Sequence, residues 1–140
     1  MRVVLDTNVL LAALISPYTP PDTIYRAWRD RRFELVTSTK QLEELRRVSR
    51  YPKLRRILPP HRVGAMVNNM QGAVVLERLP ELPQDVELSD PDDAFLVATA
   101  IAGGAAWLVT GDRRAGLLQL GRVGGAAIVT PREFVREIGR

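Results

Sequence analysis

The chain has 140 residues, of which 46% are hydrophobic and 26% are charged, as is typical of a globular domain. It has no cysteine, which excludes a disulfide framework and a thiolate metal site and fits a reducing cytoplasm. The net charge of +4 comes almost wholly from arginine and mildly favours a nucleic acid or an acidic protein as partner. Asp6 and Asn8 interrupt the apolar start of the chain, which argues against a signal peptide. We therefore expect one domain over residues 1–140, located in the cytoplasm.

Strand-like and helix-like segments alternate along the chain. In order, we expect a strand at 2–6, helices at 8–15 and 24–31, a strand at 33–37, a helix from 38 or 39 to about 50, a helix at 61–71 and a strand at 73–76. After a polar loop at 78–89, we expect a helix at 91–102, a strand at 106–110, a short helix near 115–120, a strand at 126–129 and a helix at 132–138. Pro17, Pro20 and Pro21 should close the first helix. This alternation predicts a three-layer α/β domain, with a central parallel sheet of about five strands and helices on both faces.

The uncharged segment 94–111 approaches the roughly 18 residues that a membrane-spanning helix needs. Gly103 and Gly104 divide it into a helix-like half and a strand-like half. We therefore expect a buried helix followed by a buried strand.

Acidic residues recur where predicted strands end and where predicted helices begin. Asp6 ends the first strand, and Asp112 directly follows the fourth. Because the carboxyl ends of parallel strands meet at one edge of a sheet, we expect these two carboxylates to lie close together. Other acids occur in the helix after the second strand and at the start of the helix before the fourth: Glu43, Glu44, Asp90, Asp92 and Asp93.

Several carboxylates held close together raise one another's pKa, and a bound cation relieves this repulsion at neutral pH. Oxygen ligands without histidine or cysteine favour Mg²⁺ or Mn²⁺. Such ions bind phosphates and lower the pKa of a bound water. Together with the arginines, the acids therefore suggest a metal-dependent nuclease.

Each acid also has a purely structural interpretation. Asp6 could simply cap the helix that follows it. Residues 90–93, Asp-Pro-Asp-Asp, are typical of a helix start, and Glu43 could pair with Arg46 or Arg47 at helical spacing. The placement of the acids at one sheet edge is what favours a functional site.

The motifs, in this order, resemble those of the PIN domain family, and the resemblance covers essentially the whole chain. They are Asp6-Thr7-Asn8, Leu42-Glu43-Glu44-Leu45, Asp93-Ala94-Phe95-Leu96-Val97-Ala98-Thr99-Ala100 and Thr110-Gly111-Asp112. The resemblance implies a Rossmann-like fold and a Mg²⁺- or Mn²⁺-dependent endonuclease, usually acting on RNA. Small single-domain proteins of this kind are commonly toxins of toxin–antitoxin pairs, often homodimers inhibited by a cognate antitoxin.

The resemblance also implies roles for individual residues. The residues that match the catalytic, metal-holding carboxylates are Asp6, Glu44, Asp93 and Asp112, with Asp90 as a further candidate ligand. Register favours Glu44 over Glu43 and Asp93 over Asp92. The side chains expected to support the carboxylates or bound water are Thr7, Asn8 and Thr110.

Residues 46–56 contain six basic residues and no acid. Those expected to contact RNA phosphates or an acidic segment of an antitoxin are Arg46, Arg47, Arg50 and Lys53. The alternative is a solvated helix face without a binding role.

Two other functions compete with an active nuclease. A receiver-like signalling domain also gathers acids around Mg²⁺ and accepts a phosphate on one aspartate, but it needs a lysine after a late strand, and no lysine follows Lys53. The other competitor is a catalytically inactive PIN module that only binds RNA.

Overall fold

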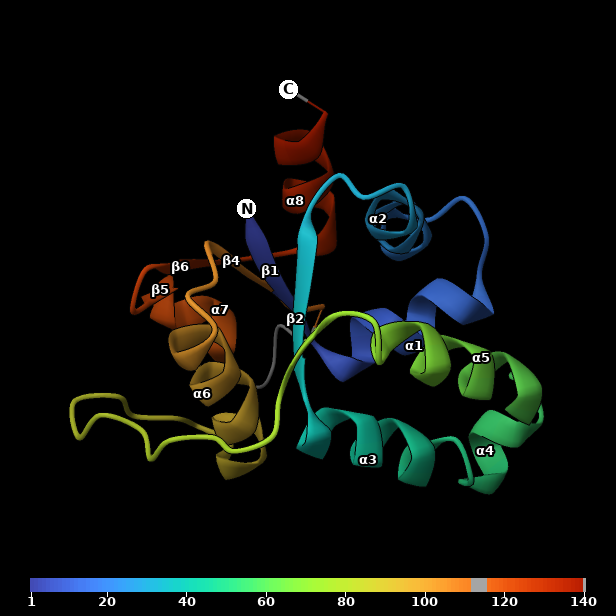
Figure 1. The fold of residues 1–140 in the computed structure, drawn as a ribbon, viewed down its shortest axis with the longest axis horizontal. Coiled ribbons are helices and arrows are strands. Elements are labelled where there is room, and N and C mark those ends of the chain that lie inside the picture. Colours follow the sequence, from blue (N-terminus) through green and yellow to red (C-terminus); the bar gives the residue numbers. More distant parts are fainter. Residues whose placement is uncertain (112–115, 140) are drawn as a thin grey trace.

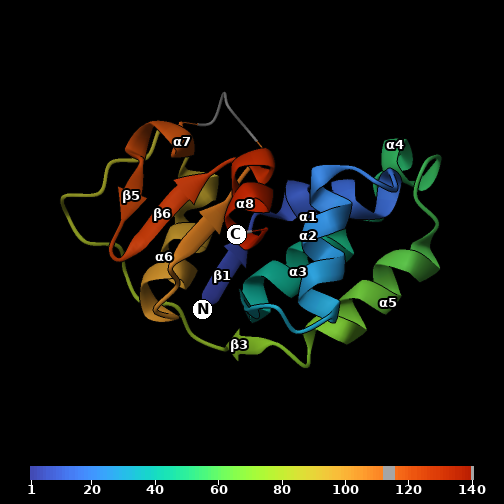
Figure 2. The same cartoon turned by 90° about the horizontal axis from the view of Figure 1, so that it is seen from above.

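The computed structural model describes residues 1–111 and 116–139. Its centre is a sheet of six strands in the order β3-β2-β1-β4-β6-β5 (Figures 1 and 2). The strands are β1 (Arg2–Leu5), β2 (Glu34–Ser38), β3 (Val74–Leu76), β4 (Trp107–Val109), β5 (Arg122–Val123) and β6 (Ala126–Val129). The first five strands in spatial order pair in parallel, and β5 pairs with β6 antiparallel.

Helices cover both faces of this sheet. They are α1 (Thr7–Ile15), α2 (Pro20–Arg29), α3 (Thr39–Val48), α4 (Pro52–Arg55), α5 (Pro60–Met70), α6 (Ala94–Ala102), α7 (Leu117–Leu120) and α8 (Pro131–Ile138), with a 3₁₀ turn, η1 (Pro91–Asp93), before α6. One apolar cluster joins the sheet to α1, α2, α3, α5 and α8, and a second joins it to α6 and α7. Figure 1 shows α6 and α7 on one side of the sheet and α1, α2 and α5 on the other. The predicted three-layer α/β fold is therefore confirmed.

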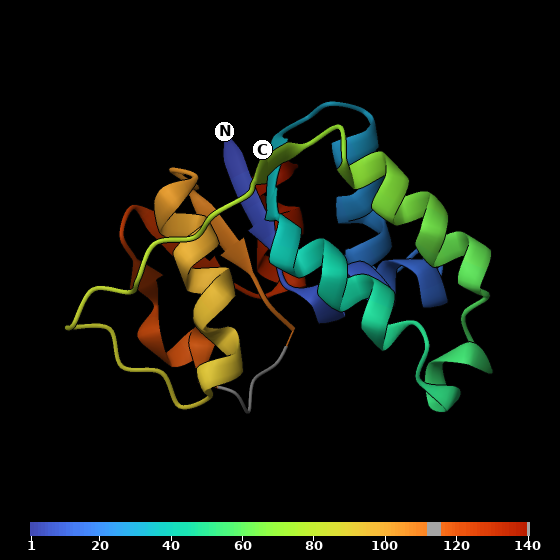
Figure 3. The ribbon, with the colours of Figure 1, turned by 60° about the horizontal axis from the view of Figure 1, so that its bottom comes forward.

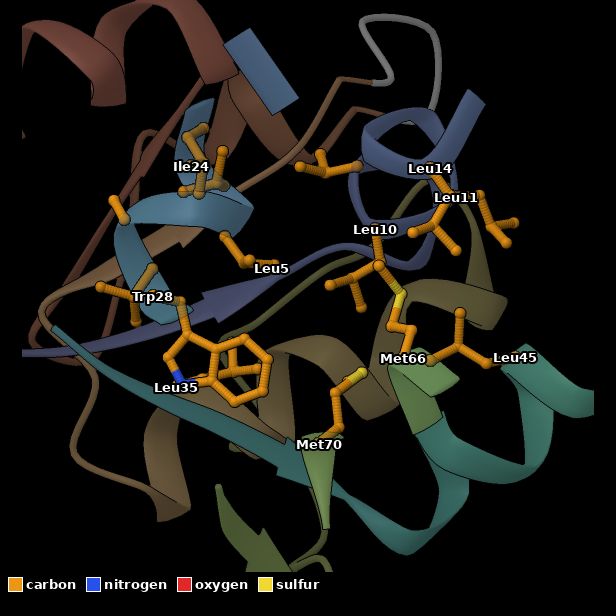
Figure 4. Close-up of a cluster of buried hydrophobic side chains, with 14 of the residues drawn as sticks. Leu5, Leu10, Leu11, Leu14, Ile24, Trp28, Leu35, Leu45, Met66 and Met70 are labelled. Carbon is orange, nitrogen blue, oxygen red and sulfur yellow. The ribbon is translucent and has the colours of Figure 1, made fainter. Parts of the chain in front are cut away.

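Strand β1 lies in the middle of the sheet because its side chains are apolar on both faces. Val3 and Leu5 point into the larger cluster and Val4 into the other, as the alternation of a strand requires. All three are at most 1% exposed. Figure 4 shows Leu5 among the side chains of the larger cluster, near Leu10 of α1. The end of β1 is thus held rigidly by packing on both sides.

The first helix ends at the predicted residue, but the role predicted for Pro20 and Pro21 was wrong. Helix α1 ends at Ile15, before all three prolines. Pro20 and Pro21 begin α2 instead of closing α1, with Thr19 as the residue before the first turn. Proline suits this position because it has no N–H and its φ is already helical.

Two short elements were not predicted. Helix α4 follows Tyr51 and begins at Pro52. Strand β5 forms a hairpin with β6 through Gly124 and Gly125, a pair of residues that is a recognised hairpin signal. The five predicted strands are those of the parallel part of the sheet, and β5 adds an antiparallel edge.

The uncharged segment 94–111 forms α6 and then β4, as predicted. No helix within the described ranges 1–111 and 116–139 is both long and apolar enough to cross a membrane.

Two glycines provide a test of how tightly α6 packs on the sheet. A Cβ at Gly103, which follows α6, would lie 2.5 Å from Cγ1 of Val36 and 2.9 Å from the Thr99 carbonyl oxygen. Gly103→Ala should therefore lower the free energy of unfolding by about 1–3 kcal/mol through overpacking. Gly64 of α5 has no atom within 4 Å of such a Cβ, so Gly64→Ala should raise it by about 0.5–1 kcal/mol. Urea unfolding measures both values, and effects of the same sign would contradict this packing.

Candidate active site

Asp6 lies at the carboxyl end of β1 and is only 8% exposed. Its backbone N–H donates to the Val109 carbonyl at 2.9 Å, which ties it to the neighbouring strand. Its Oδ2 accepts a hydrogen bond from the Thr110 hydroxyl at 2.8 Å, and its Oδ1 accepts one from the Asn8 N–H at 3.5 Å. Asp6 therefore does cap the helix that follows it, but through a long hydrogen bond. Its shorter hydrogen bond comes from Thr110, which follows the neighbouring strand β4.

Glu44 reaches the same edge of the sheet from α3. The Thr7 hydroxyl donates to Oε2 of Glu44 at 3.1 Å. Thr7 is buried and directly follows Asp6 in the chain, so the residue that binds Glu44 is the immediate neighbour of Asp6. Glu43 is exposed and makes no such bond to β1 or α1. Of the two adjacent glutamates, Glu44 is the one that lies against Asp6.

Burial of Asp6 raises its pKa, and the nearby negative charge of Glu44 raises it further. Hydrogen bonds from Thr110, Asn8 and Thr7 oppose this rise. Asp6 is thus largely removed from water, and the half-buried Glu44 carboxylate lies beside it. A hard divalent cation matches this set of oxygen donors, because it would neutralise the repulsion without requiring histidine or cysteine.

The three aspartates before α6 differ in their contacts. Asp90 caps the 3₁₀ turn, because its side chain accepts from the Asp92 N–H at 2.9 Å. Asp92 is exposed and faces α3 across a pocket of 470 Å³ that Glu44 also lines. Asp93 is half-buried at the start of α6. Asp90 thus caps a helical turn, as the structural interpretation predicted, and the choice of Asp93 as the third ligand stays a prediction.

Asp112, the predicted fourth ligand, lies outside the described residues. Within residues 1–111 and 116–139, no three histidine, aspartate or glutamate side chains approach closely enough to form a metal site. The described part of the site is therefore the pair Asp6 and Glu44. Asn8, whose backbone N–H binds Asp6, is exposed, and its Oδ1 would be 3.8 Å from a Cβ placed on Gly111.

Comparison with known protein families identifies the fold that carries this site. A family model of the PIN domain matches residues 2–114. The chain belongs to the PIN domain family. PIN domains are generally nucleases, so this chain has a nuclease-type fold. No curated protein matches the sequence.

Gln41 is a residue of this PIN domain that sequence reasoning missed. It is 1% exposed, and its amide Nε2 donates to the Leu5 carbonyl at 2.7 Å. The Thr37 hydroxyl donates to its Oε1 at 2.5 Å, and its own N–H donates to Oγ of Ser38 at 3.1 Å. The spacing of Ser38 and Gln41 matches a capping box, but the side chain reaches across to β1 instead. Gln41 thus sets the position of α3, and with it Glu44, against the end of β1.

Replacing Gln41 should therefore affect both stability and the site. Gln41→Met leaves the Leu5 carbonyl and the Thr37 hydroxyl without this partner, so it should cost about 1–3 kcal/mol of unfolding free energy. Gln71→Met is the matched control at an exposed position and should change stability by less than about 0.5 kcal/mol. Urea unfolding gives both values. Equal stabilities of the two variants would show that the buried network does not hold α3.

Asp6→Asn should stabilise the metal-free protein at neutral pH. The pKa of Asp6 is raised, so its charged form opposes folding above that pKa. Asn keeps an oxygen for the Thr110 hydroxyl and has no charge, so we expect a melting temperature about 3 °C higher in EDTA, equivalent to about 1 kcal/mol. As the pH falls through the raised pKa, Asp6 becomes protonated and the difference should shrink. A wild-type protein more stable than the variant at neutral pH without metal would contradict the assignment.

Proposed function

We propose that this PIN domain is a Mg²⁺- or Mn²⁺-dependent endoribonuclease and the toxin component of a type II toxin–antitoxin system. The observation that carries the proposal is the buried Asp6 carboxylate at the edge of the sheet, held by Thr110 and repelled by Glu44. A merely structural cap would gain nothing from a second carboxylate beside it. A second carboxylate does suit a site for a divalent cation, which proteins commonly hold with one or two carboxylates.

The chain's own residues would divide the work as follows. The carboxylates proposed to hold the metal are Asp6, Glu44, Asp93 and Asp112, with Asp90 as a further candidate. A bound Mg²⁺ or Mn²⁺ supplies a water of lowered pKa and stabilises charge on the phosphate. The hydroxyls of Thr110 and Thr7 orient the first two carboxylates, and the bond from Thr110 favours the charged form of Asp6. Asn8 is exposed two residues after Asp6, and its side-chain amide can donate to a water or to an oxygen of the RNA.

The basic run after the site supports RNA or an acidic protein as partner. Four of its residues are exposed: Arg46, Arg47, Arg50 and Lys53. None of them forms an ion pair within 4.0 Å with an acid in the part of the chain that the structure describes. Such cations can bind phosphates or carboxylates. A cognate antitoxin with an acidic segment, a homodimer and a cytoplasmic location complete the proposal, and they rest on the resemblance to small PIN proteins.

Removing either carboxylate should abolish RNA cleavage. Asp6→Asn and Glu44→Gln should each lower the rate of cleavage of a labelled RNA in Mn²⁺ by at least about 100-fold, because each would lose a metal ligand. Glu43→Gln removes the same charge one residue earlier and should keep most of the activity. Cleavage by Asp6→Asn at the wild-type rate would refute the proposed site. A wild-type protein that binds RNA but gains no thermal stability from Mn²⁺ would instead be an inactive binding module.

A further inference from the structure

The pocket beside Glu44 contains two cations that the proposed catalysis does not use. Lys40, Glu44 and Arg47 are three and four residues apart, so they share one face of α3. This face and the start of α6, with Pro91, Asp92 and Phe95, enclose the pocket of 470 Å³. Figure 3 shows the two helices that supply these residues, α3 (teal) and α6 (gold), at the front of the molecule. A volume of this size is typical of a small-ligand site.

In the part of the chain that the structure describes, neither cation forms an ion pair with the acids that line the pocket. Lys40 and Glu44 are four residues apart and could pair, yet among the described residues neither Lys40 nor Arg47 has a carboxylate within 4.0 Å. The Thr7 hydroxyl draws Glu44 toward β1 and away from its helix neighbours. Two positive charges therefore remain available in the pocket next to the candidate metal ligands.

Contacts with aromatic rings orient both cations. Arg47 Nη1 donates to the Tyr51 hydroxyl at 2.6 Å, and its guanidinium lies 5.9 Å from the centre of the Tyr51 ring. This leaves the other N–H groups of the guanidinium for a ligand. The Lys40 ammonium lies 5.8 Å from the centre of the Phe95 ring. Such contacts reduce the number of conformations that each side chain would lose on binding an anion.

A second hollow of 310 Å³ adjoins the first and shares Lys40 and Phe95 with it. It continues away from Glu44 toward the loop after β3, where Leu79, Pro80 and Leu82 line it. Lys40 thus stands where the two hollows meet. Two adjoining hollows with a cation between them suit a polymer of linked nucleotides, whose phosphates alternate with apolar faces.

We propose that Lys40 and Arg47 bind the phosphates of the RNA nucleotides next to the bond that is cut. The ribose and base of one nucleotide occupy the pocket against Phe95 and Pro91, and the phosphate that follows lies at Lys40. This subsite rests on the proposed nuclease function. It positions the strand relative to Glu44 and does not take part in the chemistry.

The test compares two double variants that lose the same charge. Lys40→Gln with Arg47→Gln removes both pocket cations. Arg29→Gln with Arg136→Gln removes two exposed cations from α2 and α8, which lie at the top of the molecule in Figure 1, whereas α3 lies at the bottom. For the full chain in Mn²⁺, the pocket variant should raise KM for a labelled RNA by about tenfold or more, with kcat nearly unchanged. The control variant should keep both values near those of the wild type.

Binding without cleavage separates the subsite from the nuclease. In an Asp6→Asn background, the slope of log affinity against log salt should fall by about 0.7 for each phosphate contact that the pocket variant loses. Equal effects of the two double variants on KM and on this slope would overturn the subsite while leaving the nuclease intact. If the wild type cuts no RNA, the nuclease proposal fails, and the salt slope still decides the subsite. A pocket variant that loses affinity for a polyglutamate peptide but not for RNA would overturn RNA as the occupant.

Discussion

The hydrogen bond from Thr110 to the buried Asp6 carboxylate is the contact on which the site depends. It joins the ends of β1 and β4, two neighbouring parallel strands, and the two bonded residues are 104 positions apart in the chain. The strands bring these ends together only because β1 packs apolar side chains into both clusters. An acid at this position loses water, which raises its pKa, and a bound cation would oppose that rise. The burial of the charged Asp6 carboxylate at this strand end therefore lowers the stability of the metal-free fold.

A second constraint sets the distance between β1 and α3. The side-chain amide of Gln41 donates to the last carbonyl of β1 and accepts from the Thr37 hydroxyl of β2. Its backbone N–H donates to the side chain of Ser38, also of β2. A buried amide that both donates and accepts is held firmly, because a shift would leave a buried polar group without its partner. Glu44 is one helical turn further along α3, so the same network sets its direction toward Thr7. The network thus links the strand ends to the helix that completes the site.

The sequence predicted those features that depend on local pattern. The apolar run of β1 and the abrupt change at Asp6 were enough to place a strand end, and α6 and β4 followed from the apolar segment divided by Gly103. Pro20 was predicted to close the first helix, but it begins the second. Proline occurs at both places, and which role it takes depends on the packing of α2 against α1 and α8. Gln41 was missed because its key partner, Leu5, is 36 positions away. No periodicity along the chain reports a contact of that kind.

Helix α3 has an apolar side that holds it to the fold and a charged face that serves the site and the pocket beside it. Leu42 and Leu45 are buried in the larger cluster and fix the helix to the fold. Glu44 is turned toward β1 by Thr7, which removes it from the charge pairs that its spacing would otherwise allow. For this reason Lys40 and Arg47 have no carboxylate partner among the described residues, although acids line the same pocket. A single hydroxyl on α1 therefore directs one charge of α3 into the site and leaves two opposite charges facing the path that we propose for the RNA.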